Sequence, residues 1–193
     1  MKIYFVTSSE PKRREFKDFL ASASDVATVE IAVLNGDLDE VLDHDIDNIV
    51  THKALGAYGD VGLPCVVEHS GLFMDALPGL PGGLGQVIWK AVGERMCQFL
   101  RPDDSRAATA RSVLGYCNGR VVHLFSGETR GHVAECARGE YAFNWDQIFI
   151  PDGATQTYGE MSPDERRRTS PAHKAWTKLV SALADELKRG PKP

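Results

Sequence analysis

The chain opens with an apolar run that gives way to an amphipathic pattern within its first twenty residues. Residues 2–7 are rich in β-branched and aromatic side chains, which predicts a short buried strand. The polar turn Ser8-Ser9-Glu10-Pro11 follows, and apolar side chains then recur at helical spacing over residues 12–20. Because proline is favoured in the first turn of a helix, this pattern predicts a strand, a turn and a helix, as at the start of an α/β unit.

Strands and helices alternate along the rest of the chain. We expect strands at residues 26–34, 64–67, 107–117, 120–126 and 147–150, and helices at residues 46–58, 84–100 and 171–188. Asn118-Gly119 is a strong hairpin signal between two of these strands. The order of elements predicts an α/β fold in which helices pack on a mixed sheet. With no repeat or linker in 193 residues, we expect a single domain spanning residues 1–193.

Charge and composition exclude several classes of protein. The net charge of −5 argues against a nucleic-acid binder, and the basic run at residues 166–168 is too short to reverse that, although it could hold a small polyanion. No segment approaches the roughly 20 apolar residues of a membrane span. The four cysteines form no Cys-x-x-Cys pair and are typical of a reducing compartment. We therefore expect a cytoplasmic protein without membrane or nucleic-acid partners.

Two polar segments are candidates for a ligand site. Thr7 and Ser9 lie in a strand-to-helix turn, where backbone N–H groups and the helix dipole favour anions, and Lys12 adds a positive charge. Glu68-His69-Ser70-Gly71 ends a short buried strand, and α/β sheets bind ligands at such strand ends. Taken singly, Lys12 is typical of a solvated lysine and His69 of a partly buried structural histidine. Their occurrence together favours a site.

Four segments, taken in order, resemble a known family. They are Thr7-Ser8-Ser9-Glu10-Pro11-Lys12, Glu68-His69-Ser70-Gly71-Leu72 with the Gly/Pro-rich residues 77–83, Phe143-Asn144-Trp145-Asp146, and residues 151–162. Their order and spacing resemble the Ham1 family of inosine triphosphate pyrophosphatases, which remove deaminated purines from the nucleotide pool. The resemblance covers residues 1–183.

The resemblance implies an elongated α/β fold, usually a homodimer, with two lobes around a central nucleotide cleft. It also implies magnesium-assisted hydrolysis of inosine or xanthosine triphosphate to the monophosphate and pyrophosphate. The residues it assigns to the nucleotide, together with those proposed above, are Thr7, Ser9, Lys12, Ser70, Gly71, Phe143, Trp145, Asp146, Arg166, Ser170, His173 and Lys174. Phe143 would stack on the base, whereas Trp145 would lie partly in the core.

Departures from the family pattern fall on the chemistry. His69 stands where the family has the aspartate thought to activate water, although Glu68 is retained. An ungapped match through Lys53 places Asn48 where the family has a metal-binding glutamate, so the metal site of Glu68 and Asn48 would be weakened and magnesium binding reduced or lost. The family's Ser-His-Arg, which reads the base, becomes Ser170-Pro171-Ala172, unless a two-residue slip brings His173-Lys174 into its place.

Two functions follow from this pattern. In the first, the protein is a catalytically impaired sensor that binds an aberrant purine nucleoside triphosphate of the ITP, dITP or XTP type and acts with an effector enzyme, as in anti-phage defence. In the second, it is an active magnesium-dependent pyrophosphatase in which His69 is the base and Glu68, Asp47 or Asp146 surround the metal. Cleavage of the glycosidic bond is a third, more remote reading.

Overall fold

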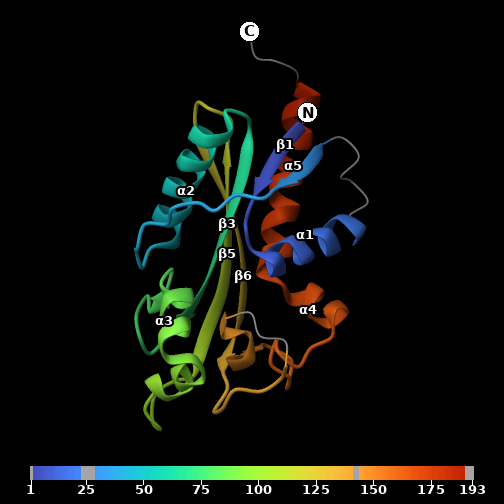
Figure 1. Ribbon diagram of the computed structural model, residues 1–193. Helices are drawn as coiled ribbons and strands as arrows, with labels where there is room; N and C mark the ends of the chain where they lie inside the picture. Colours follow the sequence, from blue (N-terminus) through green and yellow to red (C-terminus); the bar gives the residue numbers. More distant parts are fainter. Residues whose placement is uncertain (1, 23–28, 141–143, 190–193) are drawn as a thin grey trace.

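The structure is a computed structural model that describes residues 2–22, 29–140 and 144–189 (Figure 1). The described strands form a mixed sheet in the order β2-β1-β3-β5-β6-β7, and β4 pairs with β3 outside this path. The strands are β1 (Lys2–Val6), β2 (Glu30–Leu34), β3 (Cys65–Met74), β4 (Pro81–Gly82), β5 (Ala107–Cys117), β6 (Val122–Val133) and β7 (Phe149–Pro151). The helices are α1 (Glu10–Ser22), α2 (Ile46–Val61), α3 (Gly85–Val92), α4 (Pro163–Thr169) and α5 (Pro171–Arg189), with 3₁₀ helices η2 (Gly93–Phe99) and η3 (Asn144–Ile148).

The amino-terminal part forms parallel pairs. Strand β1 pairs in parallel with both β2 and β3, and α1 connects β1 to the segment before β2. Helix α1 packs against α5, on the side of the sheet opposite α2 and α3 (Figure 1). Phe5 of β1 meets Phe16 and Trp176 edge-on, with ring centroids 5.2 and 5.0 Å away. These aromatic contacts fix the middle of α1 against β1.

Strand β5 lies between β3 and β6 and is antiparallel to both, and all three run the length of the molecule (Figure 1). Helix α2 covers β3 and β5 on one face, whereas α5 covers β5 and β6 on the other. Because side chains alternate along a strand, the neighbours Glu68 and His69 point to opposite faces of β3. Glu68 shares its face with the cluster around Trp176, and His69 shares its face with the cluster under α2.

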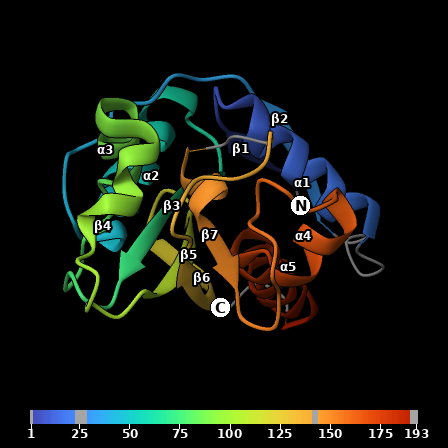
Figure 2. The same ribbon diagram turned by 90° about the horizontal axis from the view of Figure 1, so that it is seen from below.

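The other half of the molecule surrounds a second core. α3, η2, η3 and β7 pack around the far part of β3 and β5, where Met96, Trp145, Phe149 and Tyr158 are buried together (Figure 2). The sheet is thus shared between two groups of helices, which are the two lobes expected from the sequence. Among the described residues, no helix combines the length and apolar character that a membrane crossing demands.

The predicted elements are largely confirmed. The strand at residues 2–7, the helices at residues 12–20, 46–58 and 171–188, and the hairpin around Asn118-Gly119 are all present. Several boundaries were wrong. The helix expected at residues 84–100 is α3 followed by η2, and the polar cluster at residues 68–71 lies inside the ten-residue β3 and not at its end. The strand expected at residues 120–126 continues to Val133, and residues 147–148 belong to η3 and not to β7. Helix α4 was missed, although Ser162 and Glu165 form the capping box that begins it.

A glycine pair holds β4 close to β3, and it yields a first prediction. A Cβ at Gly71 would lie 2.5 Å from the carbonyl oxygen of Gly82, so we expect Gly71→Ala to lower the free energy of unfolding by about 1–3 kcal/mol. Gly56, inside α2, has open space around its Cα, and Gly56→Ala should raise stability by up to about 1 kcal/mol. Urea titration of both variants measures this, and a Gly71→Ala protein as stable as wild type would contradict the packing.

Candidate active site

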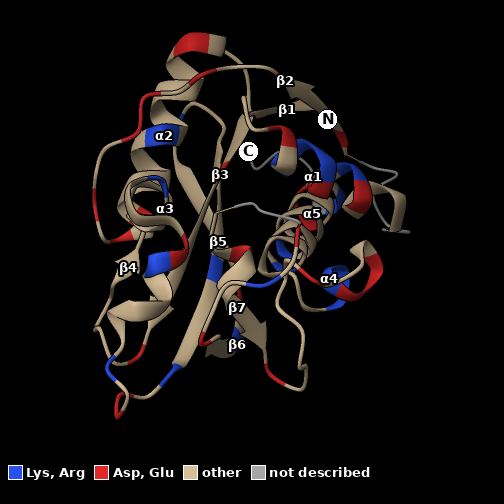
Figure 3. Cartoon of the chain, turned by 60° about the horizontal axis from the view of Figure 1, so that its bottom comes forward, with Lys and Arg blue, Asp and Glu red and all other residues tan. Residues whose placement is uncertain are grey.

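A polar cavity of about 310 Å³ lies between the two lobes. Its walls come from the β1–α1 turn, the segment before α2, strand β3 and helix α3, and three lysines line it: Lys12, Lys53 and Lys90. Acidic residues are spread along the segment between β2 and α2 (Figure 3), of which Asp37 and Glu40 line the cavity. Cations thus gather beside carboxylates and hydroxyls in a space large enough for a chain of phosphates.

The β1–α1 turn presents donors to this cavity. The Oγ1 atom of Thr7 accepts a hydrogen bond from the Ser9 N–H at 3.1 Å, which shapes the turn before α1. Lys12, one turn into the helix, donates from Nζ to the main-chain oxygen of Glu68 at 2.8 Å. Burial lowers the pKa of Lys12, although the charge of Glu68 opposes this. Thr7, Ser9 and Lys12, which the sequence proposed as ligand-binding residues, thus lie together in one wall of the cavity.

Glu68 and His69 have different partners. The Glu68 carboxylate is buried and accepts hydrogen bonds from the Ser70 and Ser112 hydroxyls, each at 3.0 Å. His69 lines the cavity, with Nε2 2.8 Å from the carbonyl oxygen of Gly83 and Nδ1 3.7 Å from Oε1 of Glu40. A carbonyl oxygen only accepts, so Nε2 carries a proton and Nδ1 is the nitrogen turned toward the carboxylate.

Glu40 lines the polar cavity although the sequence analysis did not single it out. Its carboxylate forms an ion pair with Lys53 and faces His69. The neighbouring His69 ring and the Lys53 ammonium group hold the pKa of Glu40 well below its ordinary value despite partial burial. Glu40 belongs to an irregular acidic segment without periodicity. The one signal for it in the sequence is its separation of thirteen residues from Lys53, the lysine with which it pairs.

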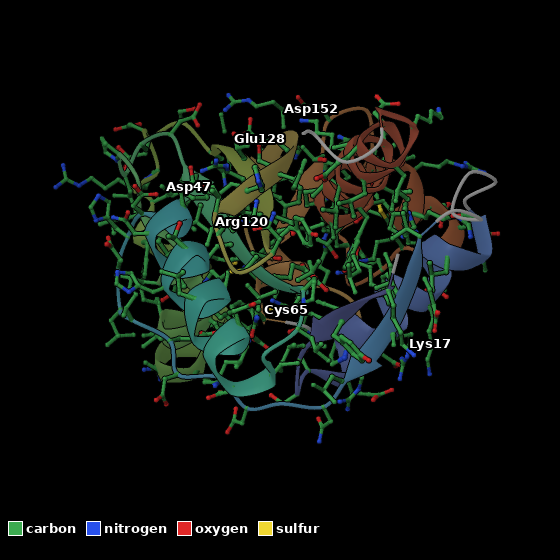
Figure 4. All side chains as sticks on the ribbon, turned by 90° about the horizontal axis from the view of Figure 1, so that it is seen from above. Lys17, Asp47, Cys65, Arg120, Glu128 and Asp152 are labelled. Carbon is green, nitrogen blue, oxygen red and sulfur yellow. The ribbon has the colours of Figure 1, made fainter. Side chains whose placement is uncertain are left out.

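The carboxylates and amide considered beside α2 lie elsewhere. Asn48 is exposed and donates to Asp43 at 3.0 Å, and Asp45 caps the start of α2. Asp47, in the first turn of α2, forms an ion pair with Arg111 of β5 (Figure 4). None of Asn48, Asp45 and Asp47 lines the polar cavity, whereas Glu40 does.

A second cavity of about 250 Å³ adjoins the first across α1. Pro11, Tyr158, Met161 and Pro163 give it apolar walls, and the charged or polar residues that line it include Glu15, Asp146, Arg166 and His173. Because Glu15 follows Lys12 by three positions, one face of α1 supplies the cation of one cavity and the carboxylate of the other.

Ion pairing arranges the polar side of the second cavity. Asp146 is buried and pairs with Arg166, whose guanidinium lies 5.3 Å from the Tyr158 ring centroid. Glu15 accepts from the Ser170 hydroxyl, and burial raises the pKa of Glu15 although Arg166 opposes this. The predicted residues Asp146, Arg166 and His173 therefore meet at one cavity, and Ser170 reaches it through Glu15.

Other predicted nucleotide residues have different surroundings. Gly71 packs under Gly82, Trp145 packs against Phe149 in the core, and Lys174 donates to the Glu128 carbonyl on β6. Ser70 lines the polar cavity, and Phe143 lies outside the described residues.

The neighbouring Asn144 has φ = 52°. Asparagine tolerates this left-handed backbone better than most residues.

Comparison with known proteins matches this geometry to one family. The model of the Ham1 family matches residues 3–182, almost the whole chain. The chain belongs to the Ham1 family. It is 35% identical over 178 residues to the dITP/XTP pyrophosphatase of Methanopyrus kandleri, covering 91% of this chain and 92% of the relative. It is 37% identical over 181 residues to inosine triphosphate pyrophosphatase 2 of Trypanosoma cruzi, covering 92% and 90% of the two chains.

Solved structures of Ham1 proteins share the fold. A Ham1 protein from Coxiella burnetii superposes with a TM-score of 0.78 at 21% identity, over 96% of this chain and all of that one. The nucleoside-triphosphatase, or dITP/XTP pyrophosphatase, of Mycobacterium abscessus gives a TM-score of 0.71 at 27% identity, over 95% and 100%. The α/β class expected from the sequence, a mixed sheet with flanking helices, is thereby confirmed.

The partly buried position of His173 gives a second prediction. Burial, with a smaller contribution from Arg167, lowers the pKa of this imidazole below its ordinary value. The unfolded chain therefore binds a proton more readily, and the stability associated with neutral His173 is present above about pH 6.5 and decreases as the pH falls below it. We expect His173→Gln to lose less stability than wild type between pH 7.5 and 5.5 in urea titrations. Equal losses in both proteins would contradict the assignment.

Proposed function

We propose that this protein hydrolyses a purine nucleoside triphosphate to the monophosphate and pyrophosphate. The two adjoining cavities of opposite character carry the proposal, since one is polar and rich in lysine and the other has apolar walls. A nucleotide needs both environments side by side. The names of the relatives, which include dITP/XTP and inosine triphosphate pyrophosphatases, support a purine substrate of the ITP, dITP or XTP class.

In this proposal the phosphates occupy the polar cavity and the base occupies the second one. The start of α1 and the Thr7–Ser9 turn provide N–H and hydroxyl donors to phosphate oxygens, and Lys12 and Lys53 provide positive charge. The base lies between the apolar walls near Tyr158 and Met161, with Glu15 and Arg166 at its polar edge. Asp146 keeps Arg166 in place through their ion pair.

The donor set of the polar cavity fits magnesium held jointly by protein and substrate. Mg²⁺ is usually bound through one or two carboxylates together with phosphate oxygens and water. Glu40 and Asp37 supply such carboxylates, although the described residues contain no cluster of three metal-binding side chains. Glu40 and Asp37 would hold the ion, which supplies neutralisation of the charge that develops on the phosphates.

His69 is the proposed general base. Its Nε2–H is committed to the Gly83 carbonyl, which orients the ring and leaves Nδ1 on the cavity side. Nδ1 accepts a proton from water as the water oxygen bonds to the α-phosphorus. The bond from that phosphorus to the α,β-bridging oxygen breaks, and pyrophosphate leaves with the electron pair. Glu40 beside the ring stabilises the imidazolium that forms.

The non-hydrolysing sensor is the second candidate. The replaced base favours it: His69 lies between a carbonyl oxygen and a carboxylate, an arrangement that suits a charged imidazolium unable to accept a further proton. The asparagine at position 48 does not favour the sensor, because Glu40 lines the cavity whereas Asn48 does not. An effector partner, a homodimer and a cytoplasmic location remain predictions from the sequence.

Product analysis tests the proposal and separates the two candidates. The protein is incubated with ITP, dITP, XTP, GTP and ATP in the presence of Mg²⁺, and products are identified by mass spectrometry. We expect monophosphate and pyrophosphate over many turnovers, with a loss of kcat of about 100-fold or more in His69→Gln and Glu40→Gln. Asn48→Ala should keep wild-type activity.

Recovery of intact triphosphate bound to the protein would replace the enzyme with the sensor. Activity lost in Asn48→Ala but kept in Glu40→Gln would overturn the assignment of the metal carboxylate.

A further inference from the structure

Lys90 differs from the other two lysines of the polar cavity. Lys12 donates to the Glu68 carbonyl, and Lys53 forms an ion pair with Glu40. Lys90 is exposed at the cavity wall, and its side chain takes part in none of the ion pairs or hydrogen bonds found among the described residues. Its ammonium group is therefore available to an anion in the cavity without first giving up a partner.

Helix α3 brings Lys90 to the cavity from the side opposite α1. α3 contacts β3, β4, η2 and η3, whereas Lys12 belongs to α1, which packs on α5 (Figure 1). Gln86 precedes Lys90 by four residues, about one helical turn, and also lines the cavity. One side of the cavity thus carries the hydrogen-bond donors of the β1–α1 turn and Lys12, and the other side carries the Lys90 side chain, unpaired among the described residues.

A long anion would use both walls. We expect inorganic phosphate to bind the donors of the β1–α1 turn and Lys12, and the longer triphosphate to meet donors on both walls. Lys90 is flexible and strongly hydrated, so it gains most from an oligophosphate that reaches the α3 side. Its location suggests a role in selection by phosphate chain length that the fixed lysines do not fill.

We propose that Lys90 makes the protein select triphosphates by binding the β- and γ-phosphates, the part of the substrate that leaves as pyrophosphate. The inference rests on the proposed function, in which the phosphates occupy this cavity. It makes Lys90 a specificity-determining residue for triphosphates over mono- and diphosphates, and it predicts that inorganic tripolyphosphate binds without a nucleoside.

Calorimetry with inorganic tripolyphosphate tests the proposal without requiring catalysis. We expect Lys90→Ala to weaken tripolyphosphate binding about tenfold and to leave the binding of inosine monophosphate within twofold of wild type. In kinetics, the ratio of kcat/KM for ITP over that for IDP should fall by a similar factor. Lys17→Ala is the matched control, because Lys17 is an exposed lysine on the outer side of α1 and away from both cavities (Figure 4).

A rescue variant distinguishes this role from a general loss of charge or folding. Gln86→Lys places a lysine one turn earlier on the same cavity wall, so the double variant Q86K/K90A should recover most of the tripolyphosphate affinity. Equal affinities of wild type and Lys90→Ala would overturn the role of Lys90 and leave the proposed function standing. Wild-type protein that binds neither tripolyphosphate nor any triphosphate would overturn both.

Discussion

The hydrogen bond from the Lys12 ammonium group to the main-chain oxygen of Glu68 joins α1 to the central strand where the two cavities meet. It satisfies a partly buried cation whose pKa burial already lowers, and it binds α1 to the backbone of β3 through a contact that no side-chain rotation on β3 can break. The aromatic contacts of Phe5 with Phe16 and Trp176 hold the same face of the helix one turn further along. Because α1 carries Lys12 toward one cavity and Glu15 toward the other, its fixed position sets the spacing of both.

Side chains alternate along β3, so Glu68 and His69 lie on opposite faces of the sheet and have different surroundings. Glu68 is buried under serine hydroxyls, where a carboxylate contributes to the local charge but is enclosed by protein. His69 points the other way and meets Glu40, which comes from an irregular segment. A buried strand therefore positions the histidine, whereas a loop supplies its carboxylate. This arrangement suits a reaction in which the base is rigid and the acidic side chain adapts to substrate and metal.

The sequence predicted much of the fold because periodicity and turn chemistry are local signals. The parallel opening unit, α2, α5 and the hairpin at Asn118-Gly119 each follow from short patterns that tertiary packing did not override. The site was predicted less completely. Thr7, Ser9 and Lys12 share one turn and could be grouped from the sequence, whereas Glu40 meets His69 only through the path of a loop without periodicity. An ungapped match through Lys53 therefore led to Asn48, which points to Asp43 and away from the cavity.

The position of Glu40 in the cavity bears on whether a protein with His69 in place of the family's aspartate can still hydrolyse a nucleotide. If the cavity had lost its metal-binding carboxylate, the imidazole of His69 would leave it with too little negative charge to bind a metal ion. Nucleotide binding without hydrolysis would then be the simpler outcome. With Glu40 present, the cavity keeps a carboxylate whose depressed pKa makes it anionic at neutral pH, and its charge offsets a protonated His69. In the proposed reaction, phosphate oxygens would compete with Glu40 for the Lys53 ammonium group and loosen this ion pair. Substrate binding would free Glu40 at the moment when a metal ion and a water molecule need it, which couples recognition of the phosphates to assembly of the reacting groups.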